Sequence, residues 1–109
     1  MPASDLRARL LDVLEPEPAP ASFPGTRAAG VLVPVVAGPE PTVVFTRRSA
    51  ELPRHAGEIS FPGGLADPED AGPIATALRE FEEELGVSAS SVEVLGALPP
   101  VHTVVSGIL

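Results

Sequence analysis

Residues 79–87 read Arg-Glu-Phe-Glu-Glu-Glu-Leu-Gly-Val, and this stretch does more than any other to decide the fold. On a helical wheel, Glu83 and Glu84 fall within about 60° on either side of Glu80. The apolar residues of the same segment lie on the opposite face; they are Leu78, Phe81 and Leu85. This pattern of one acidic and one apolar face predicts a helix that packs on a core and presents three carboxylates together.

The ends of this helix are marked by residues that favour a start and a stop. Pro73 suits the first helical position, because its missing N–H would have no partner there. Gly86 is a natural C-terminal stop, since glycine readily adopts the left-handed conformation. The sequence therefore predicts a helix over residues 73–85.

The residues alone leave two interpretations of the three carboxylates open. Like charges at i, i+4 repel by a few tenths of a kcal/mol per pair, and a divalent cation with oxygen ligands would offset that repulsion. Mg²⁺ and Mn²⁺ use one or two carboxylates together with water and substrate phosphate oxygens. A solvated acidic surface accounts for the same three residues without any ligand.

The remaining elements follow from hydrophobic pattern and turn residues. A helix at the N-terminus followed by a proline-rich tether is expected over residues 1–24, with packing of the helix on the domain favoured over a partner-binding role. The globular domain is expected over residues 25–109. Its strands are predicted at 29–37, 42–47, 58–61 and 92–98, with Pro34 indicating an edge strand or bulge. Residues 62–64, Pro-Gly-Gly, are predicted to form a tight turn.

The whole composition excludes several classes of protein. A chain of 109 residues with 44% hydrophobic residues is one small globular domain. Without cysteine there is no disulfide, thiolate nucleophile or cysteine-bound zinc. A net charge of −8 disfavours nonspecific binding to nucleic acid, and no segment has the 18 or so apolar residues of a membrane helix. We therefore expect a cytoplasmic protein that binds neither nucleic acid nor membrane.

Together with the residues before it, the carboxylate helix resembles the sequence motif of the Nudix hydrolase family, called the Nudix box. The motif is G-x5-E-x7-R-E-U-x-E-E-x-G-U, where U is an apolar residue. Residues 79–87 match every specified position of the second half, with Phe81 and Val87 as U. Gly64 matches the opening glycine and follows Phe61-Pro62-Gly63, a setting typical of the family.

The first half of the box departs from the pattern by one residue. Asp70 lies six residues after Gly64, where the family has Glu, whereas Ala71 lies eight before Arg79. The acid of the first half is therefore either replaced by Asp70 or displaced within the loop.

The resemblance implies an α+β protein with the α/β/α Nudix fold, in which a mixed sheet lies between helices and the box forms a loop–helix–loop. It implies Mg²⁺ or Mn²⁺ held by Glu80, Glu83 and Glu84, with Glu83, Glu84 and Arg79 as catalytic residues. Arg79 would orient one of the carboxylates. Gly63 and Gly64 would form a backbone turn beside the substrate. The reaction implied is attack of water on a diphosphate.

Upstream residues resemble the coenzyme A diphosphatase branch of the family. The similarity lies in residues 45–49 and 52–64, although Glu58 stands where Gln is more often found. This branch cleaves coenzyme A and acyl-CoA to 3′,5′-ADP and a 4′-phosphopantetheine. Arg48 and Arg54 are candidate contacts for substrate phosphates, because a guanidinium matches phosphate geometry; pairing with loop carboxylates is the alternative.

Two other functions stay open. One is hydrolysis of another nucleoside diphosphate derivative, such as a nucleotide sugar or a dinucleotide; the other is a non-catalytic Nudix-like binding module. Nudix domains usually run further than residue 109, so we expect the domain to be C-terminally incomplete. One sheet face would then be uncovered, which favours association, including a homodimer, or instability.

Overall fold

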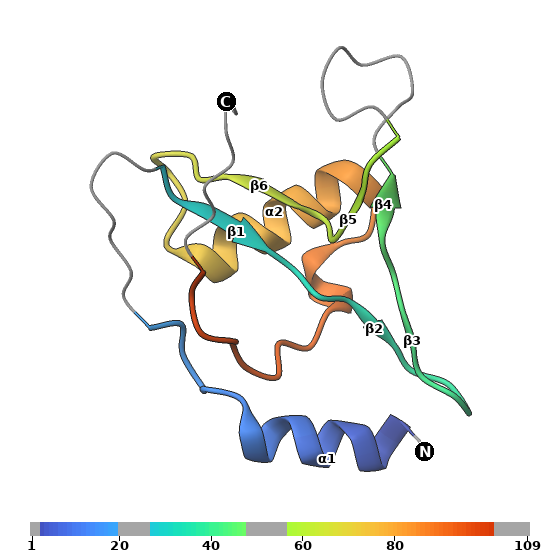
Figure 1. Ribbon diagram of the computed structural model, residues 1–109. Coiled ribbons are helices and arrows are strands. Elements are labelled where there is room, and N and C mark those ends of the chain that lie inside the picture. The colour runs from blue at the N-terminus through green and yellow to red at the C-terminus, as the bar shows by residue number, and fades with distance from the viewer. Residues whose placement is uncertain (1–2, 20–26, 48–56, 102–109) are drawn as a thin grey trace.

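The computed structural model of the protein describes residues 3–19, 27–47 and 57–101 (Figure 1). Its elements run in the order α1 (Ala3–Val13), β1 (Ala29–Val31), β2 (Val35–Val36), β3 (Thr42–Val43), β4 (Thr46–Arg47), β5 (Ile59–Ser60), β6 (Gly63–Leu65), α2 (Pro73–Leu85) and the 3-10 helix η1 (Ala89–Ser91). Two helices and short strands make an α+β protein, as the sequence predicts. None of the helices in the described ranges is long and apolar enough to span a membrane.

The strands form three antiparallel pairs, β1 with β6, β2 with β3, and β4 with β5. The single strand predicted over residues 29–37 is divided into β1 and β2, with Pro34 in the interval. Pro34 has no N–H to give to a ladder, but its carbonyl accepts a hydrogen bond from the N–H of Val44. The predicted strand over residues 42–47 is likewise divided, into β3 and β4, and β2 and β3 pair as a hairpin.

The tight turn predicted at residues 62–64 is wrong in part. Gly63 and Gly64 belong to β6, where Gly64 is the direct partner of Gly30 in β1. Neither glycine of β6 has a positive φ; among the glycines of the described segments, Gly57, Gly86 and Gly96 do. Pro-Gly-Gly favours a turn, but here the two glycines allow close packing: a Cβ on Gly63 would lie 2.5 Å from the carbonyl oxygen of Gly30 in β1, and one on Gly64 would lie 2.5 Å from the Glu80 side chain of α2.

Helix α2 lies directly on β1 and β6 (Figure 1). A Cβ on Gly30 would stand 2.5 Å from the carbonyl oxygen of Pro73, so the absence of a side chain lets the first turn of the helix touch the strand. The buried residues of this contact are few; they are Gly30, Pro62, Thr76, Ala77 and Phe81. The helix boundaries are those predicted, with Pro73 in the first turn and Gly86 left-handed at φ 70°.

Residues 92–98 do not form the predicted strand. Their one ladder contact in the described part of the chain is an isolated bridge between Ala97 and Glu15. A β-branched sequence favours an extended backbone, but a strand also needs a neighbour along its length. The segment has no continuous partner among the described residues.

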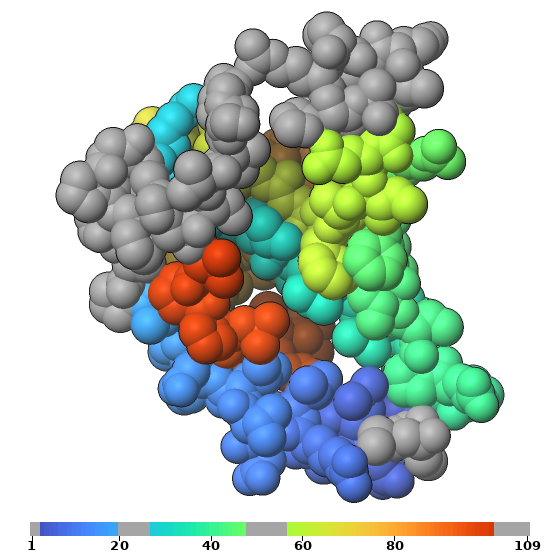
Figure 2. All heavy atoms as spheres, in the orientation of Figure 1, coloured from blue at the N-terminus to red at the C-terminus, as the bar shows by residue number. Residues whose placement is uncertain are grey.

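Helix α1 contacts the rest of the protein through this same segment. Arg7 pairs with Glu93, and its Nε lies 2.9 Å from Oε1 of that carboxylate. Figure 2 shows α1 lying along one side of the molecule, next to the segment that follows η1. The helix buries none of its residues, so it is held by polar contacts at its edge rather than by a core.

Candidate active site

The site predicted from the carboxylate helix lies where α2 passes over β6 and the loop that follows it. Arg79 is central to it, because its guanidinium contacts groups from three parts of the chain. Nη1 lies 2.9 Å from Oε2 of Glu80 and 3.1 Å from Oε2 of Glu83. Nη2 donates to the carbonyl oxygen of Leu65 at 3.0 Å, which attaches the helix to the end of β6.

Glu84 and Glu80 both face the glycines of β6. The N–H of Gly63 donates to Oε2 of Glu84 at 3.0 Å. A Cβ on Gly64 would lie 2.5 Å from Cδ of Glu80, closer than a real side chain allows. The two glycines thus bring the strand backbone against the helix carboxylates, and this close approach replaces the turn expected of them.

Asp70, whose place in the box was ambiguous, is the main partner of Arg79. Its Oδ1 lies 3.1 Å from Nε of Arg79 and its Oδ2 lies 3.0 Å from Nη2. Oδ2 also accepts the N–H of Asp67 at 2.9 Å and the hydroxyl of Thr76 at 2.8 Å. The carboxylate is only 8% exposed. The single sequence signal for this role was its distance from Gly64, because loop length hides which acid reaches the helix.

Hydrogen bonding stabilises the charged forms of this pair. The contacts with Arg79, followed by the hydrogen bond from the Asp67 N–H, hold the pKa of Asp70 well below its usual range. The same carboxylate raises the pKa of Arg79, so the guanidinium stays protonated. Asp67 adds a weaker ion pair, with its Oδ2 3.5 Å from Nε of Arg79. The loop and the helix are thus joined by opposite full charges.

The residues present fit a hard divalent cation in their chemistry. Carboxylate oxygens are the ligands that Mg²⁺ and Mn²⁺ prefer, and Mg²⁺ often takes one or two of them with water and phosphate. Among the described residues, no three His, Cys, Asp or Glu side chains form a ready metal-binding group. Glu80 and Glu83 instead share Nη1 of Arg79, and Glu84 faces Gly63. The structure thus places the three on one side of α2, each beside a donor of this site.

The predicted phosphate contacts, Arg48 and Arg54, lie outside the described residues. Arg47, the last described residue before them, ends β4.

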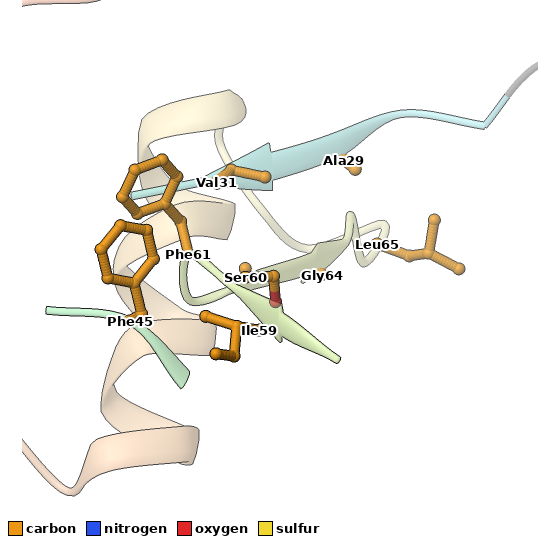
Figure 3. A pocket seen from close by; sticks show the side chains of 9 residues that line it. Ala29, Val31, Phe45, Ile59, Ser60, Phe61, Gly64 and Leu65 are labelled. Carbon is orange, nitrogen blue, oxygen red and sulfur yellow. The ribbon is translucent and has the colours of Figure 1, made fainter. Parts of the chain in front are cut away.

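An open apolar hollow of about 570 Å³ lies on the side of β6 that faces away from α2 (Figure 3). Side chains alternate along a strand, so Val31 and Leu65 face this hollow while their neighbours Gly30 and Gly64 face α2. Phe45 and Phe61 stack in its wall, with ring centroids 4.6 Å apart. Its lining residues carry no ionisable side chain; they are Ala29, Val31, Phe45, Ile59, Ser60, Phe61, Gly63, Gly64 and Leu65.

The structure thus combines an α+β fold with an Arg-Glu-x-x-Glu-Glu helix that packs on a strand containing two glycines. The model of the NUDIX domain matches residues 26–106, and the chain belongs to the Nudix hydrolase family.

Two curated relatives agree with this assignment. The "Uncharacterized Nudix hydrolase NudL" of Yersinia enterocolitica serotype O:8 is 54% identical over 88 residues, which cover 80% of this chain and 45% of that protein. The protein of the same name from Yersinia pestis strain Pestoides F is 53% identical over 77 residues, covering 71% of this chain and 39% of the relative. The chain therefore spans less than half the length of the curated relatives it matches.

Proposed function

We propose that the protein is a divalent-metal-dependent diphosphatase that hydrolyses coenzyme A or acyl-CoA in the cytoplasm. The observation that carries the proposal is the set of contacts around Arg79, which holds Glu80 and Glu83 beside a strand whose Gly63 N–H holds Glu84. Three acidic side chains on one face would repel one another without such partners. An arginine and a backbone donor hold these acids close together, which favours a working site over a solvated surface.

The chemistry follows from the residue types. Glu80, Glu83 and Glu84 would hold Mg²⁺ or Mn²⁺, which Nudix domains generally use. When bound, the cation would neutralise charge on the bridging phosphates and lower the pKa of the attacking water. Water adds to one phosphorus of the diphosphate and the bridging oxygen leaves with the other phosphate, giving 3′,5′-ADP and 4′-phosphopantetheine from coenzyme A.

The chain's own residues supply position and charge. Arg79 fixes the rotamers of Glu80 and Glu83 by charge-assisted hydrogen bonds, and the Gly63 N–H fixes Glu84. In phosphoryl transfer most of the acceleration comes from such positioning and electrostatics. The coenzyme A specificity rests on the resemblance of residues 45–49 and 52–64, with Arg48 and Arg54 proposed to contact the substrate phosphates.

Product analysis by chromatography tests the proposal. The protein would be incubated with Mg²⁺ or Mn²⁺ and one of four substrates: coenzyme A, NADH, ADP-ribose or a nucleoside triphosphate. We expect selective release of 3′,5′-ADP from coenzyme A. Selective cleavage of NADH or ADP-ribose would instead assign another nucleoside diphosphate derivative, and binding without cleavage would assign a non-catalytic module.

Glu84→Gln is the informative variant, because glutamine keeps the carbonyl oxygen that accepts from Gly63 while it removes the charge. We expect turnover to fall strongly with the fold unchanged. Glu82→Gln makes the same chemical change on the same helix but away from the face of Glu80, Glu83 and Glu84, where the side chain accepts the N–H of Ala89 at 3.3 Å. Glu82→Gln should keep normal rates; near-normal rates in Glu84→Gln would overturn the ligand assignment.

A further inference from the structure

Thr76 of the carboxylate helix carries a buried hydroxyl. The residue is fully buried, 0% exposed, near the start of α2. Threonine is a weak helix former, and a buried apolar position would accept valine of the same shape. A buried hydroxyl is tolerated where it has a hydrogen-bond partner. The partner of the Thr76 hydroxyl therefore indicates the role of this group.

The hydroxyl has two acceptors within reach and one hydrogen to give. Its oxygen lies 2.8 Å from Oδ2 of Asp70 and 3.2 Å from the carbonyl oxygen of Gly72. The charged and closer acceptor is the stronger of the two. The hydroxyl therefore approaches the Asp70 carboxylate from the helix, while the N–H of Asp67 approaches the same oxygen from the loop.

These two donors fix the orientation of the Asp70 carboxylate toward Arg79. Its remaining contacts are those with Nε and Nη2 of the guanidinium, at 3.1 and 3.0 Å. With those two nitrogens held, Nη1 is directed to Glu80 and Glu83. The contacts form one continuous chain from a buried hydroxyl to two of the proposed metal ligands.

We infer that Thr76 is a positioning residue for the hydrolytic site, acting through Asp70 and Arg79 on Glu80 and Glu83. The inference rests on the proposed function for the role of those two carboxylates. The loop is one residue longer than the general box and carries Asp, one methylene shorter, in place of Glu. The hydroxyl of Thr76 supplies a second anchor for this shorter acid.

The test compares Thr76→Val, which keeps the shape and removes the hydroxyl, with Thr76→Ser, which keeps the hydroxyl and removes the methyl. The first readout is the Nε–H signal of Arg79 in ¹H–¹⁵N spectra of the protein without metal, assigned by its loss in Arg79→Lys. We expect Thr76→Val to lose the protection of this proton from exchange with water and Thr76→Ser to keep it. This readout needs neither turnover nor metal.

The second readout is activity on coenzyme A with Mn²⁺, together with Mn²⁺ affinity by titration calorimetry. Loss of an outer partner of a metal ligand typically costs 10–100-fold, and we expect about tenfold in kcat for Thr76→Val, with little change in KM and recovery in Thr76→Ser. A loss confined to thermal stability, with Arg79 protection and kcat unchanged in Thr76→Val, would overturn the inference.

Two further outcomes are distinguishable. If the unmodified protein cleaves none of the substrates, the proposed function fails, while the Arg79 signal still decides whether Thr76 positions the guanidinium. If Thr76→Val does not fold, Thr76→Ala is compared with Thr76→Ser by the same signal; loss of protection in both, or in neither, contradicts a role for the hydroxyl.

Discussion

The carboxylate of Asp70 lies in the fork of the Arg79 guanidinium, with Oδ1 3.1 Å from Nε and Oδ2 3.0 Å from Nη2. This two-point contact joins the loop after β6 to the helix that carries the three site carboxylates. It leaves Nη1 for Glu80 and Glu83, so the loop acid governs the geometry of residues it does not touch.

Asp70→Asn should therefore impair catalysis more than an equal change at a nearby acid. The amide has lost the charge and one acceptor oxygen, so Arg79 keeps at best half of its fork. We expect kcat on the cleaved substrate to fall about 10–100-fold. Asp67→Asn is the matched control, since Asp67 is more exposed and lies 3.5 Å from Nε. Equal losses in the two variants would contradict the role given to Asp70.

The same pair predicts a pH dependence of stability. Because Arg79 lowers the pKa of Asp70 in the folded protein, the carboxylate is ionised there at pH values where it would be protonated in the unfolded chain. Its stabilisation is complete above the unfolded pKa, about 4, and is lost as pH falls toward the folded pKa. Urea unfolding between pH 7 and pH 3 should show unmodified protein and Asp70→Asn converging below about pH 4. A difference that stays constant with pH would contradict this prediction.

Gly64→Ala should displace Glu80, because the added Cβ would stand 2.5 Å from Cδ of that side chain. The displaced atoms are the end of a flexible side chain, so we expect a loss of activity with little change in the free energy of unfolding. Gly38→Ala is the control, since the nearest atom to its Cβ is the carbonyl oxygen of Glu40 at 3.8 Å. Chemical denaturation and turnover of both variants test the prediction, and a fully active Gly64→Ala would contradict it.

The apolar hollow predicts binding of hydrophobic molecules and self-association. Ile59 is 63% exposed in its wall, whereas Val13 is 72% exposed on α1, away from it. We expect Ile59→Thr to reduce the fluorescence of bound anilinonaphthalene sulfonate and to shift sedimentation toward the monomer. Val13→Thr should change neither. If the two variants behave alike, the hollow is not the surface responsible.

The sequence by itself determined the helix and the chemistry of its exposed face. Pro73, Gly86 and the spacing of the glutamates are local features, so the boundaries of α2 and the grouping of Glu80, Glu83 and Glu84 on one side follow without knowledge of any neighbour. The match to the Nudix box also indicates the family without knowledge of any tertiary contact.

Elements that need partners were predicted less well. The runs over residues 29–37 and 42–47 are extended, but pairing divides each into two short strands, and residues 92–98 lack a continuous neighbour. Extended propensity is a property of a segment, whereas a ladder is a property of two segments, so composition cannot assign it.

Tertiary structure alone decided what Asp70, Thr76 and the glycines do. Spacing left the loop acid ambiguous, because the path of a loop determines which carboxylate reaches Arg79. The sequence predicts a turn at Gly64, because it shows that a side chain is missing but not what occupies its place; here Glu80 does. Helical periodicity fixes where side chains point along one element, but only packing brings the loop, β6 and α2 within hydrogen-bonding distance of one guanidinium.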